Sequence, residues 1–197
     1  MADSTWHTVV GVVLRVRGPR LESSTSRVEL HRGESLEDAL ARAVDVGALA
    51  HHEQLETRAL ADGTLATVYL GLVPSDRGLA GAWTPVDGKD ELVAAATARL
   101  RAKLSYTNIG FALAPATFTV SELREIYVAA LGHEVSPTNL QRVLVRRGVL
   151  ERVEGTRAPG RAGGRPAALF RFALTRLEVT DQFAVLAPRR PGSRASG

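Results

Sequence analysis

The stretch that decides the fold is FTVSELREIYVAALGHEVSPTNLQRVLVRRG, residues 118–148. Thr119 and Glu122 have the spacing of a capping box, in which the cap hydroxyl accepts a hydrogen bond from the third amide and the glutamate reaches back to the cap. Apolar residues then recur on one face as far as Leu131, and Gly132 is typical of a helix end. The first part of this stretch therefore predicts a short capped helix.

A second helix is expected directly after the turn 133–135. Ser136 is a favourable cap, Pro137 suits the first helical position, and Gly148 marks the expected end. Two capped helices joined by so tight a turn predict a helix-turn-helix.

Two expected strands, residues 149–153 and 167–172, follow the helix pair and would form a hairpin. A hairpin in this position turns the motif into a winged helix-turn-helix. The loop between the strands, residues 154–165, carries three arginines that we expect to contact DNA: Arg157, Arg161 and Arg165. A solvated loop without a ligand would also carry such residues.

The second helix has a face suited to the major groove of DNA. A helical wheel places Leu140, Val143 and Leu144 on the buried side, and Arg147 lies nearer to it. Arginine can fork onto guanine, asparagine or glutamine can pair with adenine, and free amides in a first helical turn can hold a phosphate. Any surface helix is polar outside, but the preceding helix and the following wing favour DNA binding. The expected contacts are Ser136, Thr138, Asn139, Gln141, Arg142 and Arg146.

Charge is unevenly divided along the 197 residues. The net charge of +4 is the sum of −5 over residues 1–91 and +9 over residues 92–197. A basic C-terminal half invites a polyanion such as DNA. The chain has no cysteine and no apolar run long enough to span a bilayer, so we expect a soluble, cytoplasmic protein without a membrane partner.

The N-terminal part predicts a small α+β unit. Its expected elements are strands at 6–16 and 27–30, a helix at 36–46 capped by Ser35, a hairpin of strands 54–60 and 65–73, and a loop at 74–88. A helix over 90–104 would connect this unit to the winged helix. The expected organisation is a first domain over 1–88, a connecting helix over 89–106, a winged helix-turn-helix over 107–187 and a disordered basic tail over 188–197.

Candidate catalytic and metal-binding residues are few. His51-His52-Glu53 might suggest a metal site, but neighbouring strand residues point to opposite faces. His133 has no second histidine four residues on, as a zincin motif requires. We therefore expect no catalytic residues, no metal and no cofactor.

Four stretches resemble one family. They are Ala98–Thr107, Phe118–Leu123, Asn139-Leu140 and Gly164–Phe172, and in order and spacing they are similar to the DNA-binding domain of Nudix-related transcriptional regulators of NAD metabolism. This resemblance implies a Nudix-like domain followed by a winged helix-turn-helix. It also implies a homodimeric repressor on a palindromic operator near NAD-metabolism genes, which ADP-ribose in the Nudix-like cavity releases.

The Nudix box itself is degenerate. Glu34 and Arg42 keep the family spacing, whereas Val28 stands where the box has its first glycine. The helix carboxylates that would hold magnesium fall on Ala43, Val46 and Gly47, none of which can ligate a metal. We therefore expect no hydrolysis, and we interpret Glu34 and Arg42 as a surface pair that keeps the helix in place.

Two alternatives stay open at this point. The protein could be a hydrolase of ADP-ribose or another nucleoside diphosphate derivative, with a basic accessory domain. Its metal ligands would then have to come from the nearby acids Glu34, Glu37, Asp38 and Asp45. Alternatively, the first domain could serve only to dimerise or to bind another protein. The sequence does not identify residues that bind an effector.

Overall fold

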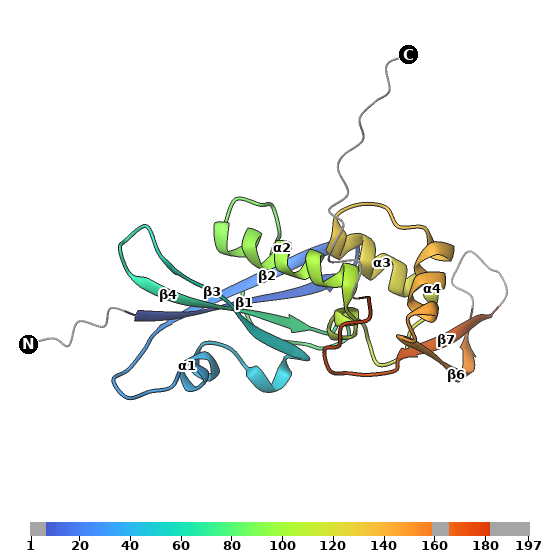
Figure 1. The fold of residues 1–197 in the computed structure, drawn as a ribbon, viewed down its shortest axis with the longest axis horizontal. Coiled ribbons are helices and arrows are strands. Elements are labelled where there is room, and N and C mark those ends of the chain that lie inside the picture. The colour runs from blue at the N-terminus through green and yellow to red at the C-terminus, as the bar shows by residue number, and fades with distance from the viewer. Residues whose placement is uncertain (1–6, 159–165, 182–197) are drawn as a thin grey trace, which may run out of the picture.

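The computed structural model describes residues 7–158 and 166–181. Trp6, Arg161, Arg165 and the tail at 188–197 lie outside the described residues. A five-stranded sheet makes up most of the N-terminal unit, and a helix-rich unit with a two-stranded sheet follows it (Figure 1). No helix among the described residues is long and apolar enough to cross a membrane.

The large sheet has the strand order β3-β4-β1-β2-β5. β1 pairs in parallel with β4, and the other neighbours in the sheet are antiparallel. α1 covers one face of this sheet and α2 the other, which explains why β1 is buried from Thr8 to Val16 (Figure 1). The strands are β1 (His7–Arg17), β2 (Arg20–Glu29), β3 (His51–Ala59), β4 (Leu65–Val73) and β5 (Thr84–Pro85).

Two predictions for the first unit were wrong in extent. The strand expected at 27–30 is the end of β2, which begins at Arg20 directly after the Gly18-Pro19 turn and pairs along most of β1. The helix expected at 36–46 is α1 (Leu36–Ala43), followed by the 3₁₀ turn η1 (Val46–Ala48). The Ser35 cap is confirmed, because its side chain accepts a hydrogen bond from the Asp38 amide. The hairpin of β3 and β4 is also confirmed, although β3 begins at His51 and not at residue 54. The loop expected at 74–88 contains the short strand β5, which pairs with β2.

α2 (Glu91–Tyr106) begins at the Asp90 cap, whose Oδ1 accepts hydrogen bonds from the amides of Leu92 and Val93. Its buried side contacts β1 and β3, and it also contacts α3. α2 is therefore a layer of the first unit as well as a connection to the second. The domain boundaries expected at residues 88 and 106 stay a prediction.

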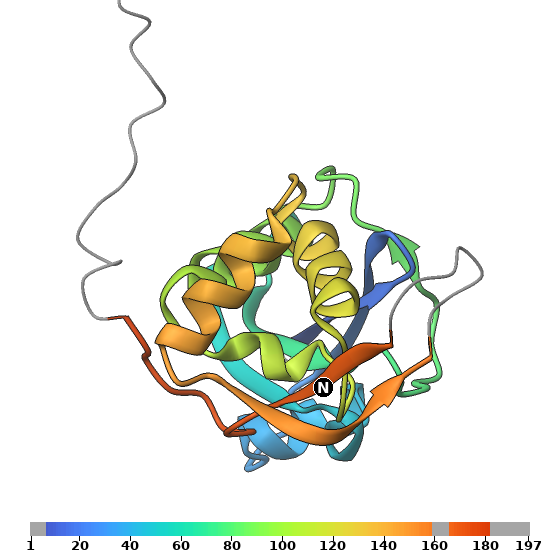
Figure 2. The same cartoon turned by 90° about the vertical axis from the view of Figure 1, so that its right-hand side faces the viewer.

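The second unit contains the short helix η2 (Ile109–Ala112), α3 (Val120–Leu131), α4 (Pro137–Arg146), β6 (Leu150–Arg157) and β7 (Ala167–Phe172). Figure 2 shows β6 and β7 passing below α3 and α4. α4 ends before the expected Gly148, whereas β6 runs past the expected end at Val153. The register shift between Val153 and Thr156 accommodates extra residues, and pairing resumes beyond it.

One apolar core joins the two units. Val10, Val12 and Leu70 of the large sheet belong to the same buried cluster as Leu100 of α2 and Leu144 of α4. A smaller cluster lies between α1 and the other side of the sheet. The second unit is therefore packed directly onto the first.

Candidate nucleic-acid interface

The helix-turn-helix begins with the capping box expected from the sequence. Thr119 Oγ1 accepts a hydrogen bond from the Glu122 amide at 3.2 Å, and Glu122 Oε2 accepts one from the Thr119 amide at 2.7 Å. Gly132 ends α3 with φ of 76°, a left-handed conformation that favours glycine. The capping box and Gly132 define the two ends of α3, and the second end fixes the position from which α4 starts.

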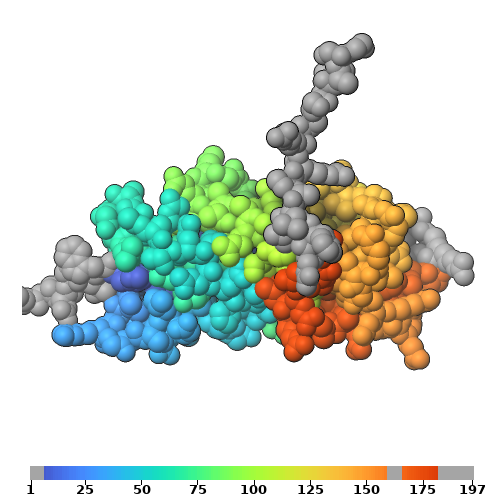
Figure 3. All heavy atoms as spheres, in the orientation of Figure 1, coloured from blue at the N-terminus to red at the C-terminus, as the bar shows by residue number. Residues whose placement is uncertain are grey.

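α4 presents a polar face to solvent and an apolar face to α3 and the hairpin. Ser136 is the cap, and its Oγ accepts a hydrogen bond from the Asn139 amide at 3.4 Å. Leu140 and Leu144 are buried, which confirms the side assigned to the core. Figure 3 shows α4 at the end of the molecule remote from α1. All six residues expected to contact DNA from this helix are exposed: Ser136, Thr138, Asn139, Gln141, Arg142 and Arg146.

The two arginines on the exposed face of α4 have no carboxylate partner among the described residues. Arg142 Nη2 donates to Asn139 Oδ1 at 2.9 Å, and Arg146 is in no ion pair there. Arg147 differs, since its side chain is 12% exposed and its Nη2 lies 2.8 Å from Asp181 Oδ2. The burial of Arg147 agrees with the sequence-based expectation that it lies nearer the buried side of α4.

Arg157 was expected in a free loop, and this placement was wrong. It is the last residue of β6, and it forms an ion pair with Glu122 at the start of α3. Burial of Glu122 opposes its ionisation, but the Thr119 amide and the Arg157 guanidinium outweigh this effect and lower the pKa of the carboxyl. Arg157 therefore links the base of the wing to α3.

The remnant of the Nudix box is an ion pair. Arg42 Nε lies 2.7 Å from Glu34 Oε1, and Arg42 Nη2 donates both to Glu34 Oε2 at 2.9 Å and to the Glu29 carbonyl at 2.6 Å. The Arg42 side chain, together with the His31 amide, lowers the pKa of Glu34 to about 2. Arg42 thus ties α1 to Glu34 and to the end of β2, as the surface-pair interpretation predicts.

A charged cluster between β3 and α2 was missed by sequence reasoning. Glu53 lies 2.5 Å from Lys103 Nζ and 3.3 Å from both Arg99 Nη1 and His51 Nε2. Burial lowers the pKa of His51, although Glu53 partly opposes this effect. Glu53 and its cationic partners fasten α2 to the sheet. Across the described residues, no group of three or more histidines or acids is placed to hold a metal.

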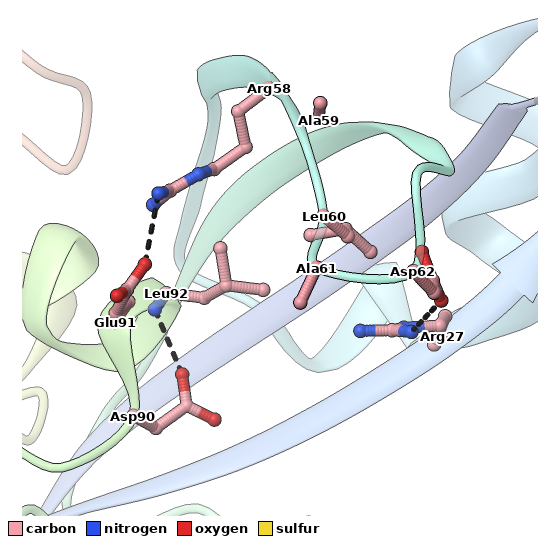
Figure 4. A pocket seen from close by; sticks show the side chains of 9 residues that line it. All are labelled: Arg27, Arg58, Ala59, Leu60, Ala61, Asp62, Asp90, Glu91 and Leu92. Carbon is pink, nitrogen blue, oxygen red and sulfur yellow. Dashed lines mark hydrogen bonds and ion pairs between the residues drawn. The ribbon is translucent and has the colours of Figure 1, made fainter.

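A pocket of about 440 Å³ lies between the turn after β3 and the start of α2 (Figure 4). Each of its two guanidiniums faces a carboxylate: Arg58 Nη2 lies 2.9 Å from Glu91 Oε2, and Arg27 Nη1 lies 3.8 Å from Asp62 Oδ2. A larger groove of about 830 Å³ lies between the two units, with Leu49 and Arg77 on one side and Leu174 on the other. Either space is large enough for a small ligand.

Residues 110–172 match the family model described as the NrtR DNA-binding winged helix domain. This part of the chain is similar to the DNA-binding winged helix of NrtR. A relative from Acinetobacter baylyi, named "ADPR responsive transcriptional repressor NtrR", is 39% identical over 84 residues. That match covers 43% of this chain and 32% of the relative, so the chain matches about a third of the relative's length.

Solved structures extend the fold comparison beyond residues 110–172. NrtR of Shewanella oneidensis in complex with a 27mer DNA has a TM-score of 0.66 at 22% identity, covering 85% of this chain and 93% of that one. A MutT/nudix family protein from Enterococcus faecalis has a TM-score of 0.63 at 15% identity, covering 88% and 90%. The α+β fold expected from the sequence, a Nudix-like unit followed by a winged helix, is confirmed.

Proposed function

We propose that this protein is a sequence-specific DNA-binding transcriptional repressor. The observation that carries the proposal is the exposed face of α4, where Arg142 and Arg146 have no carboxylate partner among the described residues. This face belongs to a domain that matches the DNA-binding winged helix of NrtR, and a solved NrtR of the same fold is bound to DNA. The protein acts on chromosomal DNA in the cytoplasm.

α4 enters the major groove in this proposal. Arg142 is near the middle of the exposed face and forks onto guanine, while Asn139 and Gln141 read adenine. Ser136 and the first-turn amides of α4 hold a phosphate and set the register. The basic wing, including Arg161 and Arg165 outside the described residues, follows the adjacent backbone. A homodimer places two such helices on the halves of a palindrome.

The Nudix-like unit senses ADP-ribose or a related nucleotide and does not hydrolyse it. The relative from Acinetobacter baylyi is named an ADPR-responsive transcriptional repressor, which supports this ligand class. Target genes of NAD metabolism follow from the family resemblance of the sequence. Ala43 and Gly47 occupy positions where a hydrolase needs carboxylates, and Glu34 is already paired with Arg42. Hydrolysis of ADP-ribose is the second candidate, because a Nudix-family protein shares the fold.

Selection of genomic fragments by the purified protein, followed by binding measurements on the recovered sites, tests the proposal. We expect Arg142→Ala to lose about 1–3 kcal/mol of discrimination between the recovered site and an arbitrary duplex, because a bidentate base contact contributes this much. Arg176→Ala is the matched control, since Arg176 is exposed, lies outside α4 and is paired with Glu178.

Three outcomes would count against parts of this function. If no fragment binds more tightly than an arbitrary duplex, the protein is not a sequence-specific regulator. If ADP-ribose and related nucleotides neither weaken DNA binding nor give heat in calorimetry, the sensor assignment is wrong. Magnesium-dependent release of AMP from ADP-ribose would favour the hydrolase instead.

A further inference from the structure

Ion pairs divide the arginines of the second unit into two groups. Most of them face a carboxylate: Arg124 with Glu134, Arg147 with Asp181, Arg157 with Glu122, Arg171 with Glu151 and Arg176 with Glu178. Within the described part of residues 107–181, only three have no carboxylate partner: Arg142, Arg146 and Arg152. The first two lie on the exposed face of α4, whereas Arg152 lies on β6 and no argument from the sequence singled it out.

The register of the hairpin places Arg152 on the side that faces the helices. Leu150 pairs with Phe172 and Arg152 with Phe170, so these residues share one face of the two-stranded sheet. Leu150, Phe170 and Phe172 pack against the core, whereas Arg152 is exposed. Its side chain therefore lies at the edge of the helix-facing surface of the hairpin.

β6 follows α4 almost directly. The Val149 amide donates to the Leu144 carbonyl at 2.9 Å, and α4 packs against β6. Figure 2 shows β6 starting at the end of α4 and running below both helices. Arg152 therefore lies in the strand that directly follows α4 and contacts it. Glu154, the nearest following acid along β6, forms no ion pair with a described residue.

We propose that Arg152 binds a phosphate of the DNA strand beside the groove that α4 enters, so that the interface continues from α4 onto β6. The inference rests on the proposed DNA-binding function. An exposed guanidinium without an internal partner can bind phosphate without breaking an ion pair. Arg157, by contrast, would have to leave Glu122 and would expose that carboxylate to the DNA backbone. The structure thus assigns Arg157 to bracing the wing and Arg152 to the contact.

The test measures the salt dependence of binding to a duplex of arbitrary sequence, because a phosphate contact does not depend on sequence. Each neutralised phosphate contributes about 0.9 to the slope of log K against log salt. We expect Arg152→Ala to reduce this slope by about 0.9. When the salt concentration rises fourfold, the natural protein should therefore lose about 3.5 times more of its affinity for DNA than the variant does. Arg152→Lys keeps the charge and should keep the slope.

Arg171→Ala is the matched control, because Arg171 is an exposed arginine of the same hairpin that pairs with Glu151 on the opposite face. It should leave the slope near that of the natural protein. An unchanged slope for Arg152→Ala, an equal loss for Arg171→Ala, or no recovery with Arg152→Lys would each overturn the inference. Absence of salt-dependent binding by the natural protein would instead overturn the proposed function. Circular dichroism of each variant establishes that the fold is intact.

Discussion

Substitution of Gly110 by alanine should destabilise the contact between η2 and the winged helix. A Cβ at this position would lie 2.5 Å from Tyr127 Oη, 3.0 Å from Tyr127 Cε2 and 3.0 Å from Phe172 Cζ. Both rings are buried, Tyr127 at 3% exposure and Phe172 at 7%, so neither can turn into solvent. The added methyl group must therefore displace packed atoms.

The magnitude follows from two opposing effects. Overpacking a well-packed core costs about 1–3 kcal/mol, whereas replacing glycine by alanine at a position without positive φ gains about 0.5–1 kcal/mol. We expect a net loss of about 1–2 kcal/mol in the free energy of unfolding. For a protein of this size, that corresponds to a fall of roughly 2–8 °C in Tm.

Tyr127→Phe provides the diagnostic second variant. Tyr127 Oη is buried without a hydrogen-bond partner, and its burial raises the pKa of the phenol. Removing this atom should leave stability unchanged or raise it, because a buried unpaired hydroxyl costs free energy. It also removes the closest contact with the new methyl group. In the Tyr127→Phe background we expect Gly110→Ala to cost about 1 kcal/mol less.

Urea unfolding followed by circular dichroism measures all four proteins of this double-mutant cycle. The urea concentration at the midpoint of unfolding should differ among the four proteins. The slope of the free energy of unfolding against urea concentration should stay the same, since the substitutions do not change how much surface unfolding exposes. Additive effects of the two substitutions would refute the steric reasoning. So would a Gly110→Ala variant that is as stable as the natural protein.

The remaining predictions concern the ends of two helices. Thr119→Ala should lower the free energy of unfolding by about 1 kcal/mol, because it removes the hydroxyl half of the capping box; an unchanged urea midpoint would contradict this. Glu34→Gln should destabilise the protein only at higher pH. The pKa of Glu34 is lowered from 4.5 to about 2, so its contribution is complete above pH 4.5 and is lost as the pH falls to about 2. The Tm values of the natural protein and of Glu34→Gln, measured across this pH range, should therefore become equal at the acidic end. A difference in Tm that stays constant with pH would exclude the ion pair as its cause.

Local signals in the sequence were sufficient to predict the helix-turn-helix. The hydroxyl and carboxylate of Thr119 and Glu122, the proline after Ser136 and the glycine after Leu131 each act within one helical turn, so they can be recognised without tertiary information. The buried and exposed sides of α4 followed from the helical period for the same reason. The pairing of Glu34 with Arg42 was expected because both residues match the spacing of the Nudix box in the family that the sequence resembles, and the structure shows this pair.

Features set by distant parts of the chain could not be predicted. β2 is rich in serine and charged residues, and its length follows from pairing with β1 rather than from its own propensity. The ion pair between Arg157 and Glu122 joins residues that are far apart in the sequence, as does the contact of Lys103 with Glu53. Arg152 looked like any other charged residue until the hairpin register placed it on the same face as Leu150, Phe170 and Phe172.

The shared core of the two units has a thermodynamic consequence. Val10 and Leu70 in the sheet belong to one buried cluster with Leu144 of α4, so melting either unit exposes apolar surface of the other. The protein should then unfold in a single cooperative transition, with calorimetric and van't Hoff enthalpies that agree. Any molecule that binds the folded sheet also raises the free energy needed to unfold α4. The free energy of unfolding of α4 and that of the sheet are therefore coupled, so a change that destabilises one also destabilises the other.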